Sequence, residues 1–344
     1  MKVTLQPSGH AFEVPEGQNI VQAGLDAGFS MPYSCRTGVC KTCRGTVLEG
    51  KVDYGFVHPN YLPDSDKAKG YALLCQAKPL TDCVIEVREL EGLAGIKPRM
   101  SPCRVTKIAK PAPDVAVLGL RLPSNENMLF LAGQYVDFLL KDGKRRSYSI
   151  ASKPAPEGVT ELELHIRHTP GGAFTDRVFG AMKEKEILRF EGPLGTFYLR
   201  DDSDKPIVMV ASGTGFAPIK SMCESLLAKG PLKRPLTVYW GCRAKRDLYM
   251  LEVPSAWSDP KLKFVPVLSD PTPECAWSGR TGFVHRAVMQ DFPDLSGHQV
   301  YACGAPVMVE AARADFSAKC KLPAEEFFAD SFLTEADKHP AAAA

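Results

Sequence analysis

The sequence lacks several features that would place it in a broad class of protein. It has no run of 18 apolar residues, and its first residues, MKVTLQPSGHAFEVPEG, lack the apolar core of a signal peptide. Neither sign of charge dominates, because 42 basic side chains stand against 40 acidic ones and the formal net charge is +2. These absences argue against a membrane partner and against electrostatic binding of nucleic acid. They predict a soluble, cytoplasmic protein.

The sequence also lacks the even cysteine count of a disulfide framework, since it has 11 cysteines and no export signal. It does have length and apolar content. The 344 residues are 44% hydrophobic. At about 150 residues per domain, such a chain holds two or three globular domains.

The chain has three regions of different pattern. Residues 1–92 contain short strands, a helix over 19–28 and a cysteine-rich loop, and 93–102 form a linker. Residues 103–203 alternate in short strand-like runs separated by glycine and proline, which is typical of an antiparallel sandwich or barrel. Residues 204–335 contain continuous apolar runs spaced by helices, as in a buried parallel sheet. The tail, 336–344, is predicted to be disordered.

Four cysteines follow the spacing C-x4-C-x2-C and then, 31 intervening residues later, a fourth: Cys35, Cys40, Cys43 and Cys75. This is the plant-type spacing for a 2Fe-2S cluster, and Gly38 and Gly45 leave the backbone free to approach the sulfides. The alternatives are reduced core thiols or a zinc site, although zinc prefers paired C-x2-C knuckles and only one is present. The loop also carries Arg36, Lys41 and Arg44, which either are solvated or favour reduction of the cluster.

Two motifs in the middle region indicate a flavin site. Arg146 and Tyr148 lie two apart on a predicted strand and therefore share one face, with Ser149 beside them. A cation suits a pyrophosphate, an aromatic ring suits a flavin, and a serine suits a ring nitrogen. The alternative is an exposed sheet surface. Support comes from Gly171-Gly172-Ala173-Phe174-Thr175, whose amides at a helix start would hold phosphate.

The last region contains two candidate elements of a nicotinamide site. A buried strand over 206–212 leads into a glycine loop and a helix, and the loop residues are Gly213, Thr214, Gly215 and Pro218. Such a loop leaves its amides for a diphosphate. A second buried strand ends in Cys303-Gly304-Ala305-Pro306. Its cysteine should lie at the carboxyl edge of the sheet, where open α/β folds bind ligands.

These motifs together resemble a known family. PYSCRTGVCKTCRGTVLEG with LLCQA looks like a plant-type ferredoxin domain of β-grasp fold, and the remaining chain is similar to the ferredoxin-NADP reductase superfamily. Over residues 1–335 the chain resembles iron-sulfur flavoprotein reductases of ring-hydroxylating oxygenases and the related CDP-6-deoxy-glucoseen reductases. The implied fold is multidomain: a ferredoxin domain, an antiparallel FAD barrel and a parallel-sheet NAD(P)-binding domain.

The resemblance also implies residue roles in the flavin site. The family's R-x-Y-S motif matches Arg146, Tyr148 and Ser149, which become the phosphate, ring-stacking and flavin-nitrogen contacts. The resemblance implies that Gly171, Gly172 and Thr175 bind the pyrophosphate of the flavin cofactor. The preceding strand, with His165, Ile166 and Arg167, becomes a contact to the nucleotide half of FAD.

In the nicotinamide site the family has G-G-T-G-x-x-P and C-G-P-P. This chain departs from them with Ser212 for the first glycine and Ala305 for the first proline. The resemblance places Cys303, with Gly304, beside the nicotinamide at the point of hydride transfer. It makes Phe328 or Phe332 the aromatic that covers the flavin. The alternative for these phenylalanines is packing at a terminal strand.

The expected function is electron transfer from NADH through FAD and a 2Fe-2S cluster to a partner protein, without a general acid or base in the hydride step. Arg243, Lys245 and Arg246 follow a strand where they would meet a 2′-phosphate, which keeps NADPH as the less favoured donor. The leading acceptor is a terminal oxygenase, and the alternative is a dehydratase of CDP-deoxysugar synthesis. A hypothesis of another class is a nonenzymatic ferredoxin-like carrier.

Overall fold

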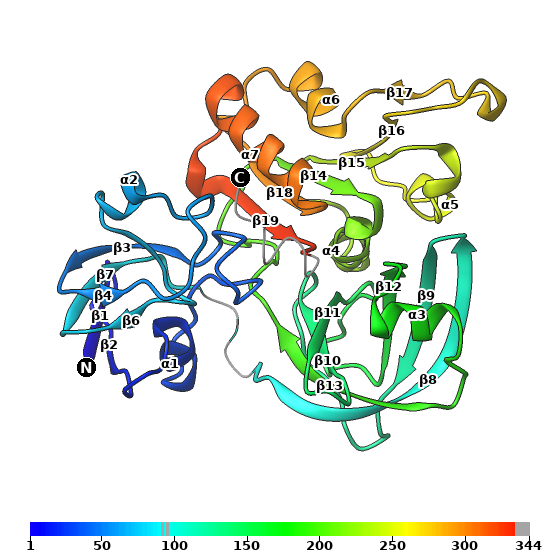
Figure 1. The fold of residues 1–344 in the computed structure, drawn as a ribbon. Helices are drawn as coiled ribbons and strands as arrows, with labels where there is room; N and C mark the ends of the chain where they lie inside the picture. The colour runs from blue at the N-terminus through cyan, green and yellow to red at the C-terminus, as the bar shows by residue number, and fades with distance from the viewer. Residues whose placement is uncertain (91–92, 94–95, 334–344) are drawn as a thin grey trace. The chain divides into compact units, whose positions relative to one another are not determined.

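Three large β-sheets follow one another along the chain in the computed structural model, with a two-stranded sheet beside the first (Figure 1). The structure describes residues 1–90, 93 and 96–333. These residues divide into two compact units. The first combines Met1–Gly95 with Gly195–Phe197, and the second combines Ile96–Leu194 with Tyr198–Phe332.

The first unit is built on a five-stranded mixed sheet in the order β2-β1-β7-β3-β5. Its strands alternate buried and exposed side chains, so one face packs on a core while the other meets solvent. The strands are β1 (Lys2–Gln6), β2 (Ala11–Glu13), β3 (Arg44–Glu49), β5 (Tyr71–Leu73) and β7 (Cys83–Glu86), with β4 (Val52–Asp53) pairing β6 (Lys78–Pro79).

Helix α1 (Ile20–Asp26) packs its apolar side into this core, and a short helix α2 (Asp64–Lys67) precedes β5. Asn19 caps α1 by accepting a hydrogen bond from the Gln22 amide at 2.9 Å. The amides of Ile20 and Val21 bond to the carbonyls of Ala77 and Leu74. These bonds connect α1 to the segment that carries Cys75.

The barrel of the second unit is a six-stranded antiparallel sheet in the order β11-β10-β13-β8-β9-β12. The edge strands meet through a bridge between Ile150 and Leu164 and through the Ala151 amide, which donates to the Glu163 carbonyl at 2.7 Å. The elements are β8 (Arg99–Ala112), β9 (Val115–Arg121), β10 (Tyr135–Leu139), β11 (Arg145–Ser149), β12 (Glu161–Arg167), α3 (Ala173–Phe179) and β13 (Ile187–Leu194).

A parallel sheet in the order β17-β16-β15-β14-β18-β19 completes the second unit. Its central strands are buried on both faces, which explains their continuous apolar runs. The strands are β14 (Ile207–Ser212), β15 (Leu236–Cys242), β16 (Leu262–Leu268), β17 (Arg280–Thr281), β18 (Gln299–Gly304) and β19 (Phe327–Ser331).

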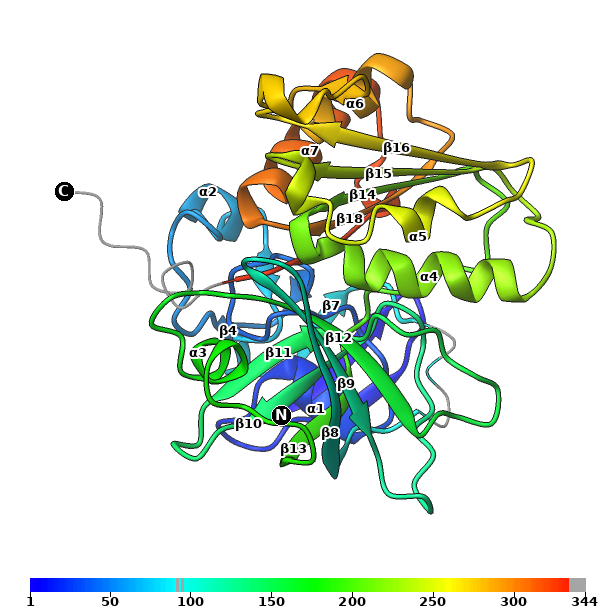
Figure 2. The same cartoon turned by 90° about the vertical axis from the view of Figure 1, so that its right-hand side faces the viewer.

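Helices cover both faces of this sheet. Figure 2 shows α4 between the sheet and the barrel strands β9 and β12, while α6 and α7 pack into the core on the other face. The helices are α4 (Phe216–Ala228), α5 (Glu252–Ser255), α6 (Val284–Asp291) and α7 (Pro306–Cys320), with single 3-10 turns η1 (Gly213–Gly215), η2 (Lys245–Asp247), η3 (Pro273–Cys275) and η4 (Ala324–Glu326).

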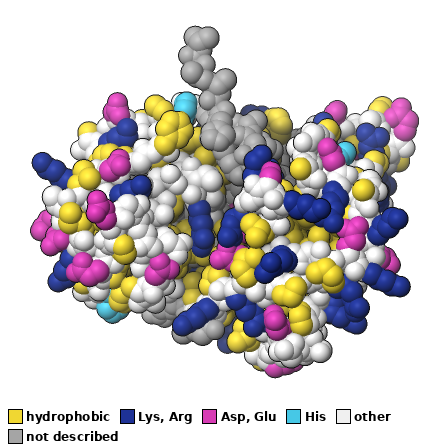
Figure 3. Space-filling model, turned by 60° about the horizontal axis from the view of Figure 1, so that its bottom comes forward, with side chains coloured by type: hydrophobic (Ala, Val, Ile, Leu, Met, Phe, Trp, Pro, Cys, Tyr) yellow, Lys and Arg dark blue, Asp and Glu magenta, His cyan; other side chains and the backbone are white. Residues whose placement is uncertain are grey.

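The fold class predicted from the sequence is confirmed, because an antiparallel barrel precedes a parallel sheet. One boundary differs: β8 begins at Arg99, within the expected linker, since residues 99–104 pair with β13. The expected disordered tail, 336–344, lies outside the described residues. Among the described residues, no helix has the length and apolarity needed to cross a bilayer. Figure 3 shows basic and acidic side chains interspersed on the face it draws.

Candidate functional site

The cysteine loop brings its four sulfur atoms into two pairs. Cys40, Cys43 and Cys75 are buried and Cys35 is half-buried, and all are free thiols. The amides of Thr37 and Cys40 each donate to the Cys35 sulfur at 3.4 Å. Gln76, which sequence reasoning missed, donates to the Arg36 carbonyl at 2.9 Å and so joins the Cys75 segment to the loop.

Within each pair of thiols, one has a lowered pKa and the other has a raised pKa. A hydrogen bond from Cys40 lowers the pKa of Cys35 to about 5, and one from Cys43 lowers the pKa of Cys75. The pKa values of Cys40 and Cys43 are raised, first by these same hydrogen bonds and then by burial. Two irons that each need two thiolates fit this arrangement. In the described part of the chain, no three His, Cys, Asp or Glu side chains gather around one point that would suit a single metal ion.

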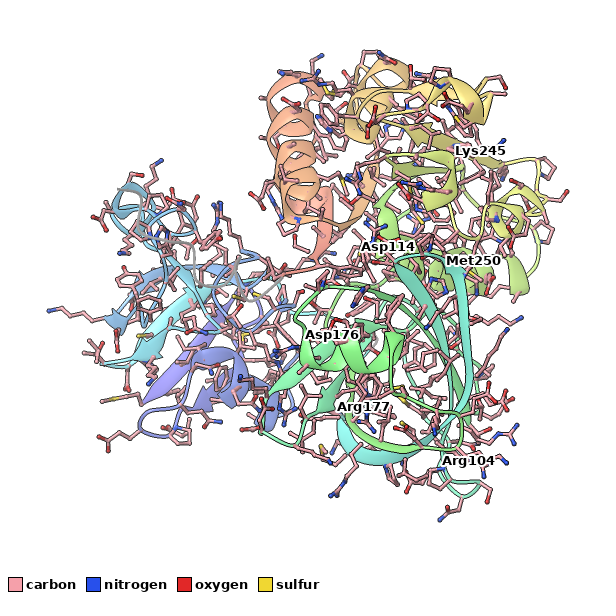
Figure 4. The ribbon with its side chains drawn as sticks, turned by 45° about the vertical axis from the view of Figure 1, so that its right-hand side comes forward. Arg104, Asp114, Asp176, Arg177, Lys245 and Met250 are labelled. Atoms are coloured by element: carbon pink, nitrogen blue, oxygen red, sulfur yellow. The ribbon has the colours of Figure 1, made fainter. Side chains whose placement is uncertain are left out.

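The two flavin motifs meet in the barrel. Tyr148 on β11 lies against Phe174 of the Gly171–Thr175 segment, with ring centroids 5.3 Å apart, and both contact Phe138 of β10. Ser149 is buried at the end of β11, while Arg146 is half-buried. Thr175 donates to the Thr169 carbonyl at 2.8 Å, which fixes the turn before α3. Figure 4 shows Asp176 and Arg177 on this helix.

Strand β12 carries the three residues that the resemblance assigned to the FAD nucleotide, of which Ile166 is buried in the barrel core. The His165 side chain is fully buried, and both ring nitrogens have protein partners in Tyr249 and Glu163. The guanidinium of Arg167 lies 3.3 Å from the point where a Cβ on Gly213 would stand, and its Nε is 3.3 Å from Asp114. The structure therefore brings Arg167 to the glycine loop.

The glycine loop and the Cys303 turn lie side by side at the carboxyl edge of the central strands β14 and β18. A Cβ on Gly215 would stand 2.2 Å from the Cys303 carbonyl oxygen, so this position has room only for glycine. The Cys303 side chain is fully buried, and this burial raises the pKa of its thiol well above the usual value. The thiol is therefore protonated at neutral pH.

The two departures from the family pattern face each other. The Ala305 amide donates to Ser212 Oγ at 3.0 Å. The family's proline at the position of Ala305 has no amide to donate, and the family's glycine at that of Ser212 has no hydroxyl to accept. This pairing was not predicted, because the two residues lie 93 positions apart.

The Ser212–Ala305 pairing predicts coupled substitutions. Ser212→Gly should cost about 0.5–1.5 kcal/mol for the lost hydrogen bond. Ala305 has φ −59°, which proline adopts, but a proline ring would press on Ser212 Oγ. The double variant Ser212→Gly/Ala305→Pro should therefore be more stable than the two single losses predict, by about 1 kcal/mol. Unfolding of all four proteins in urea measures this coupling, and additive losses would contradict it.

The terminal phenylalanines occupy different surroundings. Phe328 stacks on Tyr301 with centroids 4.8 Å apart and lies under the Arg200 guanidinium, so its ring has partners in the protein. Phe332 follows β19, and its amide donates to the Gly304 carbonyl at 2.8 Å. Of the two predicted aromatics, Phe332 is therefore the one next to the Cys303 turn.

The cysteine loop, the flavin strand and the glycine loop together define a class of protein: an iron-sulfur flavoprotein oxidoreductase. Comparison with family models agrees. The 2Fe-2S iron-sulfur cluster binding domain matches residues 3–80, the oxidoreductase FAD-binding domain matches 102–198, and the oxidoreductase NAD-binding domain matches 209–314.

Full-length relatives place the chain more narrowly. It is 40% identical to the CDP-6-deoxy-L-threo-D-glycero-4-hexulose-3-dehydrase reductase of Yersinia pseudotuberculosis, covering 97% of this chain and 98% of the relative. It is 35% identical to reductase component 2 of terephthalate 1,2-dioxygenase from Comamonas sp., covering 98% and 99%. The chain belongs to the family of three-part iron-sulfur flavoprotein reductases that includes both.

A solved structure agrees with this assignment. The Amycolatopsis cytochrome P450 reductase GcoB superposes with a TM-score of 0.75 at 34% identity, covering 96% of this chain and 98% of that one. The predicted family, enzyme class and cofactors are thus confirmed. Electron transfer to a partner protein follows from the same relatives.

Proposed function

We propose that this protein takes electrons from NADH and delivers them through FAD and the 2Fe-2S cluster to a CDP-sugar dehydratase or a terminal oxygenase. The binding of NADH is supported by one observation: the glycine loop and the Cys303 turn lie together at one edge of the central sheet. When bound, FAD supplies the chemistry that links a hydride donor to a one-electron cluster.

The residues of this chain would hold the groups as follows. The pairs Cys35/Cys40 and Cys43/Cys75 each suit one iron. Arg146, Tyr148 and Ser149 would hold the flavin end of FAD, and Gly171, Gly172 and Thr175 its diphosphate. Because Arg167 lies against Gly213, we assign its cation to the nicotinamide dinucleotide's diphosphate as well. His165 would contribute to FAD through its backbone only, since its ring is engaged.

The higher identity to the dehydrase reductase, 40% against 35% for the dioxygenase component, favours the sugar dehydratase as acceptor. This order reverses the expectation from the sequence. Purified dehydratase and oxygenase components, each mixed with this protein and NADH, test it. If this protein reduces only the oxygenase, the oxygenase becomes the favoured acceptor again.

The cysteines are all free, which supports a reducing compartment such as the cytoplasm.

We expect a larger kcat/KM for NADH than for NADPH. The loop after β15 carries Arg243, Lys245 and Arg246, but Arg246 is 80% exposed, and the carboxylate of Asp247 lies beside it at 3.9 Å. A carboxylate in this place opposes a 2′-phosphate and suits a ribose hydroxyl. Initial rates with both donors and ferricyanide as acceptor measure the preference. A larger kcat/KM for NADPH would overturn it.

Bleaching of the flavin absorbance on mixing with NADH tests the first step of the proposal, hydride transfer to FAD. Rapid bleaching is the expected result, because the family's nucleotide and flavin elements are present in one compact unit. A protein that binds FAD yet shows no bleaching would be the ferredoxin-like carrier instead.

A further inference from the structure

A polar bridge, buried except for one partly exposed carboxylate, connects the barrel to the elements around the glycine loop. We define it as Glu163, His165, Lys220 and Tyr249. His165 Nδ1 lies 2.8 Å from the Tyr249 hydroxyl and its Nε2 lies 3.1 Å from Glu163 Oε1. Lys220 Nζ lies 3.2 Å from the same Glu163 oxygen. The bridge therefore joins β12 to α4 and to the loop before α5.

The direction of each hydrogen bond in the bridge is set by chemistry. A hydrogen bond from His165, together with Lys220, lowers the pKa of Glu163 to about 2, so Glu163 is an acceptor. Burial lowers the pKa of His165 and keeps its ring neutral, so Nε2 donates to Glu163 and Nδ1 accepts from the Tyr249 hydroxyl. Burial raises the pKa of Tyr249 and keeps that hydroxyl protonated. In this orientation Tyr249, His165 and Glu163 form a continuous chain of donors and acceptors.

Tyr249 also reaches the glycine loop through an aromatic column. Its ring meets Trp240 edge-on with centroids 5.2 Å apart, and Trp240 stacks on Phe216 at 4.0 Å. Trp240 Nε1 donates to the Gly213 carbonyl at 2.9 Å. One tyrosine thus contacts β12 through its hydroxyl and the support of the glycine loop through its ring. Figure 4 shows its neighbour Met250, and Asp114 of the barrel, where the barrel and the sheet meet.

Helix α4 has a second attachment next to the flavin strand, which is β11. Lys220 Nζ lies 3.3 Å from the Ala151 carbonyl, and Ser221 Oγ donates to the Ser152 carbonyl at 2.7 Å. Ala151 and Ser152 follow directly after β11 and Ile150, and β11 carries Tyr148 and Ser149. The helix that begins at the glycine loop is therefore fixed to the segment that follows the flavin motif.

We propose that the polar bridge sets the position of the glycine loop relative to the flavin strand, and that Tyr249 is a positioning residue for hydride transfer. This inference rests on the proposed function. The bridge does not touch the reacting atoms. It acts by holding two binding elements in register, where a small displacement of reacting groups costs rate steeply.

The test compares two tyrosine variants in the full-length protein with FAD and cluster bound. Tyr249→Phe removes only the hydroxyl from the bridge and keeps the ring against Trp240. Tyr239→Phe is the matched control, because Tyr239 is also buried, on β15 of the parallel sheet, and its hydroxyl donates to Asp291 at 2.6 Å. Stopped-flow bleaching at saturating NADH, the charge-transfer absorbance with NAD+ and the Tm are measured for each.

We expect both variants to lose a similar amount of Tm, whereas only Tyr249→Phe bleaches about tenfold more slowly and has a weakened charge-transfer band. Equal bleaching rates in the two variants would overturn the inference. If Tyr249→Phe does not fold, Glu163→Gln replaces it, because Glu163 is the bridge residue that contacts both His165 and Lys220, and the same comparison decides. A wild-type protein that fails to bleach would instead refute the proposed function, so the two failures are distinguishable.

Discussion

Replacing Cys40 with serine is expected to remove the iron and the paramagnetic signal of the reduced cluster while FAD stays bound. Cys40 is buried in the loop and paired with Cys35, so its loss leaves one iron with a single thiolate. Reduction of the partner protein should fall to background. NADH-dependent reduction of ferricyanide should largely survive, because the flavin and nicotinamide elements lie in the other compact unit.

Cys83→Ser is the matched control for the cluster. Cys83 is buried in the same five-stranded sheet, but its sulfur donates to the Thr81 carbonyl at 3.2 Å and not to the loop. The Cys83→Ser variant should retain full iron content and should reduce the partner protein as the wild type does. Iron analysis and low-temperature paramagnetic spectra measure the cluster content. Reduction of the partner protein measures electron transfer through the cluster. Full partner reduction by Cys40→Ser would show that electrons reach the acceptor without the cluster.

Replacing Cys303 with alanine should slow flavin reduction about tenfold or more at saturating NADH, with FAD and iron content unchanged. Cys303 is the second-last residue of β18 and lies beside Gly215, at the sheet edge where the nicotinamide is expected. A small polarizable thiol there would press the ring toward the flavin. Because the thiol is neutral, this role is one of shape and contact, and no proton transfer is needed.

The full burial of Cys303 gives a packing role a concrete basis, and the control must separate the two. Cys320→Ala serves, since Cys320 is also buried, at the end of α7 in the core that α6 and α7 cover. Both variants remove one sulfur from a packed interior, so both should lower the Tm. If their bleaching rates match wild type equally, Cys303 is a packing residue, and alignment of the rings falls to Phe332 and the glycine loop.

The fold was largely predictable because its patterns are local. Continuous apolar runs identified β14, β15, β16 and β18, and alternating runs identified the barrel strands. The strand β6, which pairs with β4, was missed, since a two-residue strand carries no periodicity. Likewise, nothing local showed that β8 extends back to Arg99, because that extension depends on pairing with β13.

The site was predictable where a motif is contiguous and not where it is assembled across the chain. Spacing alone singled out the four cysteines, whereas the R-x-Y-S strand was matched through the family it resembles, and both assignments stay predictions. The pairing of Glu163 with His165 had a signal, since residues two apart on a strand share a face. Tyr249 had none, because it lies 84 residues from His165 and follows an irregular loop. Its role depends on tertiary contacts alone.

The contact between Ser212 and Ala305 restricts which residue combinations these two positions tolerate. If a chain starts with glycine at 212 and proline at 305, a change of proline to alanine is tolerated first, because glycine at 212 leaves the new amide open to water. Serine at 212 arriving first would meet the proline ring. Once both changes are present, the amide donates to Ser212 Oγ. Lineages that carry alanine at 305 with glycine at 212 are therefore the expected intermediates, and those with serine and proline together should be rare.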